Sequence, residues 1–259
     1  MTAKSLIYKH HLNLLIAQDQ QRLAEAAVDL LAGMIRQAVM EKGSCYLAIP
    51  GGKTPRPFFE RLATDQRVAS LPWGQVSIFW ADERYVPHDH PDSNYGLAAK
   101  TFLSRIDARV YPVPTDLGSP CQAVCTYRQT LCDAFGLRPG QIPVFDLIIL
   151  GMGVDGHIAS LMPYCYGLAE DLGPVCMVWR PDGSCRISLT GQVILAATRI
   201  ALLISGPDKA RILAEVFSQR PDPLRYPVHI LWPALEKVVW LLDTQAAALL
   251  VTTNPYPEA

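Results

Sequence analysis

Long hydrophobic runs are missing from this chain. The longest apolar stretch, residues 193–204, is interrupted by Arg199, so no segment approaches the ~20 apolar residues of a membrane-spanning helix. The apolar piece at residues 12–17 is too short for the core of a secretory signal peptide. These absences predict a protein that has no membrane partner and works in the cytoplasm.

An excess of charge of one sign is also lacking. Lysine and arginine number 23 and aspartate and glutamate 24, which leaves a net charge of −1. Such a chain has no overall basic field for nucleic acid, and any anion must be held by a local site. Half of the residues are hydrophobic and 18% are charged, as in a well-packed globular protein. We expect one α/β domain over residues 1–259.

The cysteine patterns of metal sites and disulfide frameworks are absent. The seven cysteines are irregularly spaced and include no Cys-x-x-Cys pair. Zinc binding at Cys121 and Cys125 is conceivable, but no second close pair follows. The cluster around His88 and His90 matches no known ligand spacing. We therefore expect reduced, mostly buried thiols and no metal.

What the chain does contain is a regular alternation of helical and strand-like segments. Helical patterns cover residues 19–42 with a stop at Gly43, then 55–67, 93–105, 121–135 and 206–218, and Asp243 is placed to cap a last helix. Strand-like runs cover 45–49, 76–80, 144–150, 187–189, 200–204 and 238–242, with a possible edge strand at 175–179, while 81–92 reads as a loop. This alternation predicts a doubly wound, mainly parallel sheet with helices on both faces.

The most informative segment, residues 145–163, places a histidine and an aspartate at the end of a buried strand. Three glycines follow the strand, at positions 151, 153 and 156, with Asp155 and His157 among them. The glycine spacing matches a dinucleotide fingerprint, but it falls in mid-chain and His157 follows at once, so the match is weak. The glycines fit better as room for a small ligand. His157 is then a general base, because imidazole titrates near working pH. The alternative is a histidine that only bonds its own loop.

Two further strand ends carry polar groups that suit an anion. Gly51, Gly52 and Thr54 follow one strand and precede a helix, where backbone N–H groups can face a phosphate. The loop is similar to a nucleotide-binding P-loop, but Leu47 stands where that motif needs glycine. The alternative is a tight turn between strand and helix. Lys209 lies in the first turn of another helix, where a cation is disfavoured unless an anion is also present; an ordinary exposed lysine is the alternative.

Asp82, Glu83 and Arg84 follow the strand at 76–80. The planar guanidinium of Arg84 suits phosphate, and Asp82 or Glu83 can bind hydroxyls or orient a base. A solvated strand end is the alternative.

In combination these segments resemble the 6-phosphogluconolactonase family of the glucosamine/galactosamine-6-phosphate isomerase superfamily. The resemblance covers about residues 45–245 and rests on Gly-Gly-Lys-Thr-Pro at 51–55, Asp-Glu-Arg-Tyr-Val-Pro at 82–87, Ser-Asn-Tyr at 93–95, Gly-Val-Asp-Gly-His-Ile-Ala-Ser-Leu-Met-Pro at 153–163, Arg-Ile-Ser-Leu-Thr at 186–190 and Gly-x-x-Lys at 206–209. It implies a Rossmann-like fold of the NagB/RpiA/CoA transferase type.

The resemblance also implies an activity: hydrolysis of 6-phospho-D-glucono-1,5-lactone to 6-phospho-D-gluconate in the oxidative pentose phosphate pathway. His157 would activate water, Asp155 would orient the imidazole or hold the water, and Asp82 would bind a sugar hydroxyl or orient a group. No cofactor or metal is implied, the partner is the small sugar-phosphate lactone, and a monomer or homodimer is expected. The implied phosphate ligands are Gly51, Gly52, Thr54, Arg84 and Lys209.

Two departures and two alternatives accompany the resemblance. Pro50 and Lys53 stand where the family commonly has a serine and a small or polar residue, which affects the expected phosphate contacts. A glucosamine-6-phosphate deaminase would carry Phe-Asn-Glu-Pro after the histidine and an aromatic residue in place of Arg84. This chain has Ala-Ser-Leu-Met-Pro at 159–163. A non-catalytic sugar-phosphate sensor would need the phosphate loop but not His157.

Overall fold

The protein is built around a seven-stranded parallel sheet. The computed structural model describes residues 12–52, 54–169 and 173–250. The strands lie in the order β1-β10-β9-β6-β2-β3-β5, and every neighbouring pair is parallel. Their bounds are β1 (Asn13–Ala17), β2 (Cys45–Ile49), β3 (Val76–Trp80), β5 (Arg109–Tyr111), β6 (Leu147–Leu150), β9 (Arg199–Ile204) and β10 (Val238–Asp243).

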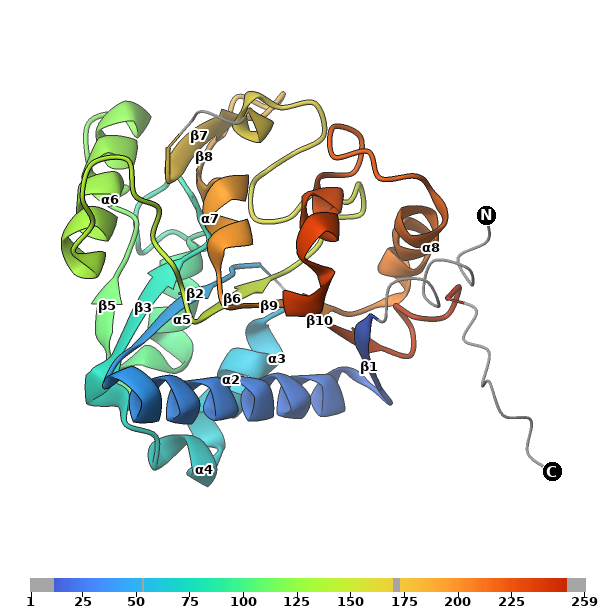
Figure 1. Ribbon diagram of the computed structural model, residues 1–259, viewed down its shortest axis with the longest axis horizontal. Coiled ribbons are helices and arrows are strands. Elements are labelled where there is room, and N and C mark those ends of the chain that lie inside the picture. Colours follow the sequence, from blue (N-terminus) through green and yellow to red (C-terminus); the bar gives the residue numbers. More distant parts are fainter. Residues whose placement is uncertain (1–11, 53, 170–172, 251–259) are drawn as a thin grey trace.

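Helices cover both faces of this sheet, which confirms the predicted doubly wound class. In Figure 1, α2 and α3 lie on one side and α7 on the other. The helices are α2 (Gln20–Lys42), α3 (Arg56–Thr64), α4 (Gln66–Ala69), α5 (Asn94–Thr101), α6 (Pro120–Phe135), α7 (Gly191–Ala196) and α8 (Ala210–Ser218). Gly43 ends α2 in the left-handed conformation, with φ at 74°, as the sequence predicted.

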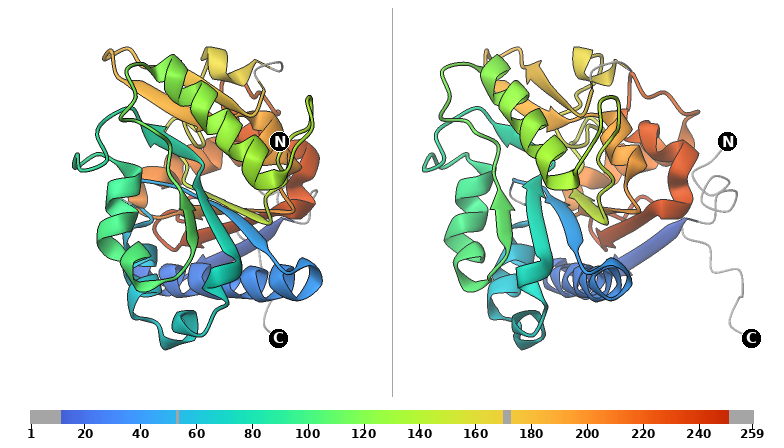
Figure 2. Two further views of the ribbon diagram at one scale, coloured as in Figure 1. Left: turned by 90° about the vertical axis from the view of Figure 1, so that its left-hand side faces the viewer. Right: turned by 60° about the vertical axis from the view of Figure 1, so that its left-hand side comes forward.

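A second, three-stranded antiparallel sheet lies beside α6. It consists of β4 (Asp82–Arg84), β8 (Cys185–Leu189) and β7 (Val175–Trp179), in that order. Figure 2 shows α6 packed against this small sheet. The prediction of a loop throughout 81–92 was therefore wrong at its start. Three consecutive charges read locally as solvated chain, but Glu83 points inward and is fully buried.

Several predicted boundaries also differ from the structure. The helix expected over 55–67 is interrupted at Asp65, which caps the short α4. Residues 103–105 form a separate 3-10 turn, and 207–209 form another before α8. Asp243 accepts hydrogen bonds from the N–H of Gly206 and of Ala246, but turns rather than a helix follow it. The strands β1 and β5 were not predicted, since they are short and lie at the two edges of the sheet.

The cysteines and the hydrophobic segments are placed as follows. Cys45, Cys176 and Cys185 are buried, whereas Cys121 and Cys125 are exposed, so the expectation of mostly buried thiols held only in part. Burial raises the pKa of the Cys45 and Cys176 thiols to about 12. Within residues 12–52, 54–169 and 173–250, none of the helices has the length and apolar character that a membrane crossing requires.

His229 couples the stability of the fold to pH. It lies in the 3-10 segment η5 (Pro227–Lys237) and is 1% exposed. Its Nδ1 accepts from the N–H of Asp222 at 2.8 Å, and its Nε2 donates to the carbonyl of Val216 at 2.9 Å. Burial lowers the pKa of this imidazole below 6.5, against the raising effect of the hydrogen bonds.

Because the unfolded chain protonates this group first, we expect the free energy of unfolding to fall as pH drops below ~6.5. One extra proton in the unfolded state gives a slope of up to about 1.4 kcal/mol per pH unit. Glutamine at position 229 offers an acceptor and a donor without titrating. Urea denaturation of wild type and His229→Gln at several pH values between 5 and 7.5 measures how the free energy of unfolding of each protein depends on pH. If the two proteins lose stability in parallel as pH drops, His229 is not the group responsible.

Candidate active site

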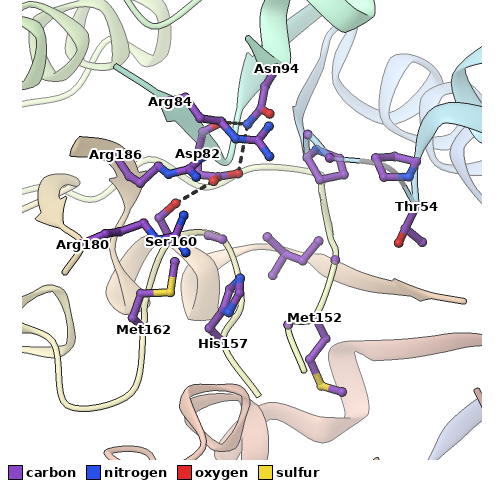
Figure 3. Close-up of a pocket in the computed structure, with 18 of the residues that line it drawn as sticks. Thr54, Asp82, Arg84, Asn94, Met152, His157, Ser160, Met162, Arg180 and Arg186 are labelled. Carbon is purple, nitrogen blue, oxygen red and sulfur yellow. Dashed lines mark hydrogen bonds between the residues drawn. The ribbon is translucent and has the colours of Figure 1, made fainter. Parts of the chain in front are cut away.

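The candidate site lies where the strand order reverses. The chain passes from β2 toward β3 and β5 on one side and from β6 toward β9 and β10 on the other, and β2 and β6 are neighbours. Ligands bind at such switch points, beyond the carboxyl ends of the strands. A cavity of about 270 Å³ opens there, lined by the loops after β2, β3 and β6 and by Arg180, Arg186 and Lys209. Figure 3 shows this cavity.

His157 and Asp155 form a hydrogen-bonded pair at the cavity. The Nδ1 of His157 lies 2.6 Å from Oδ1 of Asp155, and the same oxygen accepts the backbone N–H of His157 at 3.2 Å. Around them the loop is closed by a bond from the N–H of Gly153 to the carbonyl of His157, 2.8 Å long. With Nδ1 bound to the carboxylate, Nε2 is the ring nitrogen that remains for a ligand or a water molecule.

The carboxylate of this pair keeps its charge. Burial on its own would raise the pKa of Asp155, but the hydrogen bond and the charge of His157 outweigh it and lower that pKa to about 2. An ionised Asp155 can accept a hydrogen bond from Nδ1–H, and in the neutral imidazole Nε2 then carries no proton. This is the tautomer that a general base requires.

The three glycines of this loop have different roles. A Cβ on Gly153 would overlap the imidazole of His157 and the carboxylate of Asp155. Gly156 has φ at 81°, and a Cβ there would lie 3.3 Å from Tyr226, while a Cβ on Gly151 would meet nothing within 4 Å. The interpretation of all three as room for a ligand is therefore wrong for Gly156, which is not among the described lining residues, whereas Gly151 and Gly153 do line the cavity. Gly153 makes room for the histidine itself, and Gly156 permits a left-handed turn.

Asp82 also reaches the cavity and is held by two neighbours. Its Oδ2 accepts from the hydroxyl of Ser160 at 2.7 Å, and its backbone carbonyl accepts from Nδ2 of Asn94 at 2.7 Å. In Figure 3, Asp82, Ser160 and Asn94 lie together at one wall of the cavity. The structure thus places Asp82 and His157 on the same cavity, as expected from two strand ends far apart in sequence.

Glu83 does not face the cavity, which corrects its alternative role as a hydroxyl ligand. Its carboxylate accepts the backbone N–H groups of Arg84, Asn94 and Tyr95, each at 2.7 Å, and the hydroxyl of Ser93 at 3.2 Å. Burial raises the pKa of Glu83 more than these bonds lower it. This carboxylate joins β4 to the amino terminus of α5.

Cationic side chains dominate the rest of the cavity. Arg84 and Lys209 line it as predicted, and Arg180 and Arg186 join them. Burial and the charge of Arg84 lower the pKa of Arg186, so two like charges are held close together. Among the described lining residues, Asp82 carries the only carboxylate. Such an arrangement favours an anionic ligand.

The sequence signals for these residues differ in strength. Arg186, Ser160 and Asn94 belong to segments that carry the family resemblance, but no role had been assigned to them. Arg180 lies next to β7 in the turn toward β8 and had no sequence signal at all. Its place at the cavity follows from the packing of the small sheet.

The glycine loop after β2 completes the cavity. Gly51, Gly52 and Thr54 all line it, and Gly52 has φ at 97°, a conformation that favours glycine. Thr54 precedes Pro55, which stands at the amino end of α3. Lys53 lies outside the described residues, so its expected contribution to the loop stays a prediction.

The candidate metal positions have structural roles in the part of the chain described. The Nε2 of His88 lies 2.9 Å from the carbonyl of Val113, and its ring packs on Tyr95. The Nδ1 of His90 accepts the N–H of Asp92 at 3.1 Å. No group of three potential metal ligands occurs among residues 12–52, 54–169 and 173–250.

Fold and site together define a class of protein: an α/β protein that receives a small anionic ligand at the switch point of a doubly wound sheet. Within this class, the chain belongs to the family described as glucosamine-6-phosphate isomerases/6-phosphogluconolactonase, which matches residues 18–240. The resemblance inferred from the motifs is thereby confirmed.

Individual relatives agree with this assignment. The chain is 38% identical to 6-phosphogluconolactonase of Synechocystis, over 88% of this chain and 94% of that protein. It is 33% identical to 6-phosphogluconolactonase of Mycobacterium tuberculosis, over 91% and 97%. The crystal structure of the Thermotoga maritima 6-phosphogluconolactonase superposes with a TM-score of 0.74 at 26% identity, over 89% and 98%. A monomeric glucosamine-6-phosphate deaminase shares the fold, with a TM-score of 0.77 at 22% identity over 92% and 100%.

Proposed function

We propose that this protein hydrolyses 6-phospho-D-glucono-1,5-lactone to 6-phospho-D-gluconate, with His157 as the general base. The observation that carries the proposal is His157, which is paired with Asp155 and lines a cavity together with four cationic side chains of the described residues. The Synechocystis and Mycobacterium tuberculosis relatives, both named 6-phosphogluconolactonase, support the same substrate. As such an enzyme, the protein serves the oxidative pentose phosphate pathway.

The proposed reaction needs one activated water molecule. The oxygen of the water molecule attacks the lactone carbonyl carbon while Nε2 of His157 removes a proton from that water. Asp155 stabilises the imidazolium that forms. The tetrahedral intermediate then collapses, and the bond from the carbonyl carbon to the ring oxygen breaks. The imidazolium returns its proton to that oxygen, which becomes a hydroxyl of the open-chain acid.

The cationic side chains are proposed to bind the phosphate. The side chain of Lys209 is 14% exposed and forms an ion pair with Asp208 at 3.3 Å. Thr54, Gly51 and Gly52 line the same cavity as Lys209. With Arg84 they form the proposed phosphate site, in which a dianion compensates the like charges. The phosphate holds the lactone so that its carbonyl lies near His157.

The deaminase alternative shares the fold but not the chemistry of the cavity wall. Residues 159–162, which follow the histidine, contribute Ala159, Ser160 and Met162 to the lining. A deaminase of this superfamily would supply a carboxylate from this segment, by the resemblance that names the alternative. We therefore propose lactone hydrolysis, and not deamination, as the function.

The test is a coupled assay with lactone freshly generated by oxidation of glucose 6-phosphate. Formation of 6-phosphogluconate is followed with 6-phosphogluconate dehydrogenase and compared with spontaneous hydrolysis. We expect strong acceleration with this substrate and little with the unphosphorylated gluconolactone, since the cationic side chains then lose their partner. Absence of acceleration, or ammonia release from glucosamine 6-phosphate instead, would overturn the proposal.

A further inference from the structure

One buried acceptor in the cavity has no partner. Asn94 is 1% exposed, yet its Oδ1 accepts no hydrogen bond within the described part of the chain. Buried polar atoms are almost always paired, because an unpaired one loses its bonds to water without compensation. Asn94 lines the cavity, so the missing donor can come from a ligand.

The orientation of the amide is determined by its surroundings. The Nδ2 of Asn94 lies 2.7 Å from the backbone carbonyl of Asp82 and 3.4 Å from its Oδ1. Both of these oxygens are acceptors, so the NH₂ end must face them and the oxygen end must face away. The backbone N–H of Asn94 is bound to Glu83 at 2.7 Å, which holds the residue at the start of α5.

Gly51 explains how the amide reaches the cavity. A Cβ at position 51 would overlap the Asn94 amide, with Oδ1 as the nearest atom. Gly51 has no positive φ in the structure, so glycine is needed here for space rather than for backbone conformation. The loop after β2 and the first residue of α5 therefore meet at the amide, which Figure 3 shows beside Asp82 and Arg84.

The chemistry of this wall selects a donor. Oδ1 of Asn94 can only accept, and the neighbouring Asp82 carboxylate also only accepts. A phosphate dianion carries no donor for Oδ1, whereas a sugar hydroxyl can donate to the amide. We propose that Asn94 is a specificity-determining residue whose Oδ1 accepts a hydrogen bond from one ring hydroxyl of the sugar lactone. This inference rests on the proposed lactonase function.

The experiment compares the parent lactone with analogues that each lack one ring hydroxyl, generated in situ by oxidation of deoxyhexose 6-phosphates. For one of these analogues, wild type is expected to lose about 10-fold to 100-fold in kcat/KM, because the buried oxygen is then left unpaired. Asn94→Ala is expected to lose a similar factor on the parent lactone. It should no longer distinguish the parent from that analogue.

Two further variants separate recognition from folding. Glu83→Gln weakens the support of the same residue without removing Oδ1, so all substrates should lose by one common factor and discrimination should persist. Gly51→Ala displaces the amide without deleting it, so discrimination should vanish as in Asn94→Ala. If Asn94→Ala does not fold, Gly51→Ala serves as the test in its place.

Two outcomes would overturn the inference while the lactonase function stands. In one, wild type hydrolyses the parent lactone but discriminates against none of the analogues. In the other, Asn94→Ala loses the same factor on every substrate, which would make the residue structural. If the proposed function itself is wrong, wild type will not accelerate hydrolysis of the parent lactone at all. That result would also overturn the inference about Asn94.

Discussion

Replacement of His157 by alanine is expected to lower kcat for lactone hydrolysis by about 10²–10⁴-fold, the usual contribution of a general base. The imidazole is held by Asp155 at 2.6 Å and lines the cavity, so its loss removes proton transfer and leaves the proposed phosphate site in place. KM should change little. Steady-state kinetics in the coupled assay, corrected for spontaneous hydrolysis, measure both constants.

The pH profile provides the control for this experiment. If His157 is the base, the acid limb that levels off to a plateau in wild type should be replaced in His157→Ala by a residual rate that rises with hydroxide throughout. His157→Gln, which keeps a polar side chain of similar reach, should behave like the alanine variant. Turnover of either variant within a few-fold of wild type would show that another group activates the water.

Replacement of Asp155 by asparagine is expected to lower kcat by about 10³-fold, since exchange of the carboxylate beside a catalytic histidine for an amide has effects of this order in other hydrolases. The amide can present its NH₂ group to Nδ1 and so stabilise the wrong imidazole tautomer. It also removes the charge that stabilises the imidazolium. Asp155 acts through His157 and is therefore a positioning residue.

The roles of Asp155 and His157 can be distinguished by the pH dependence of kcat in their variants. Because the pKa of Asp155 is held at about 2, its protonation cannot produce an acid limb near neutrality in wild type. The limb should therefore persist in Asp155→Asn at much reduced rate, in contrast to His157→Ala. Asp208→Asn is a matched control, because it changes a carboxylate that pairs with Lys209 and not with the base. Loss of the acid limb in Asp155→Asn would contradict the assignment.

Much of the fold was predictable because its signals are local. Apolar periodicity and capping residues identified α2, with its end at Gly43, and the buried strands of the central sheet. The edge strands β1 and β5 and the small sheet were missed or only partly found. Their pairing partners lie far away in sequence, and Asp82, Glu83 and Arg84 look locally like a solvated loop. Only the pairing of β4 with β8 and the burial of Glu83 show otherwise.

The sequence alone determined the class of the fold and the pair of side chains proposed for the chemistry, since Asp155 and His157 follow a buried strand within one short segment. The tertiary structure decided what shares the cavity with them. The small sheet and its turn position Arg180 and Arg186 at the cavity. The Asn94 amide reaches the cavity because Gly51 has no side chain to displace it. Periodicity and spacing report interactions between neighbours in the chain. Side chains that meet only through packing, such as a lone acceptor opposite a distant glycine, leave no such local pattern.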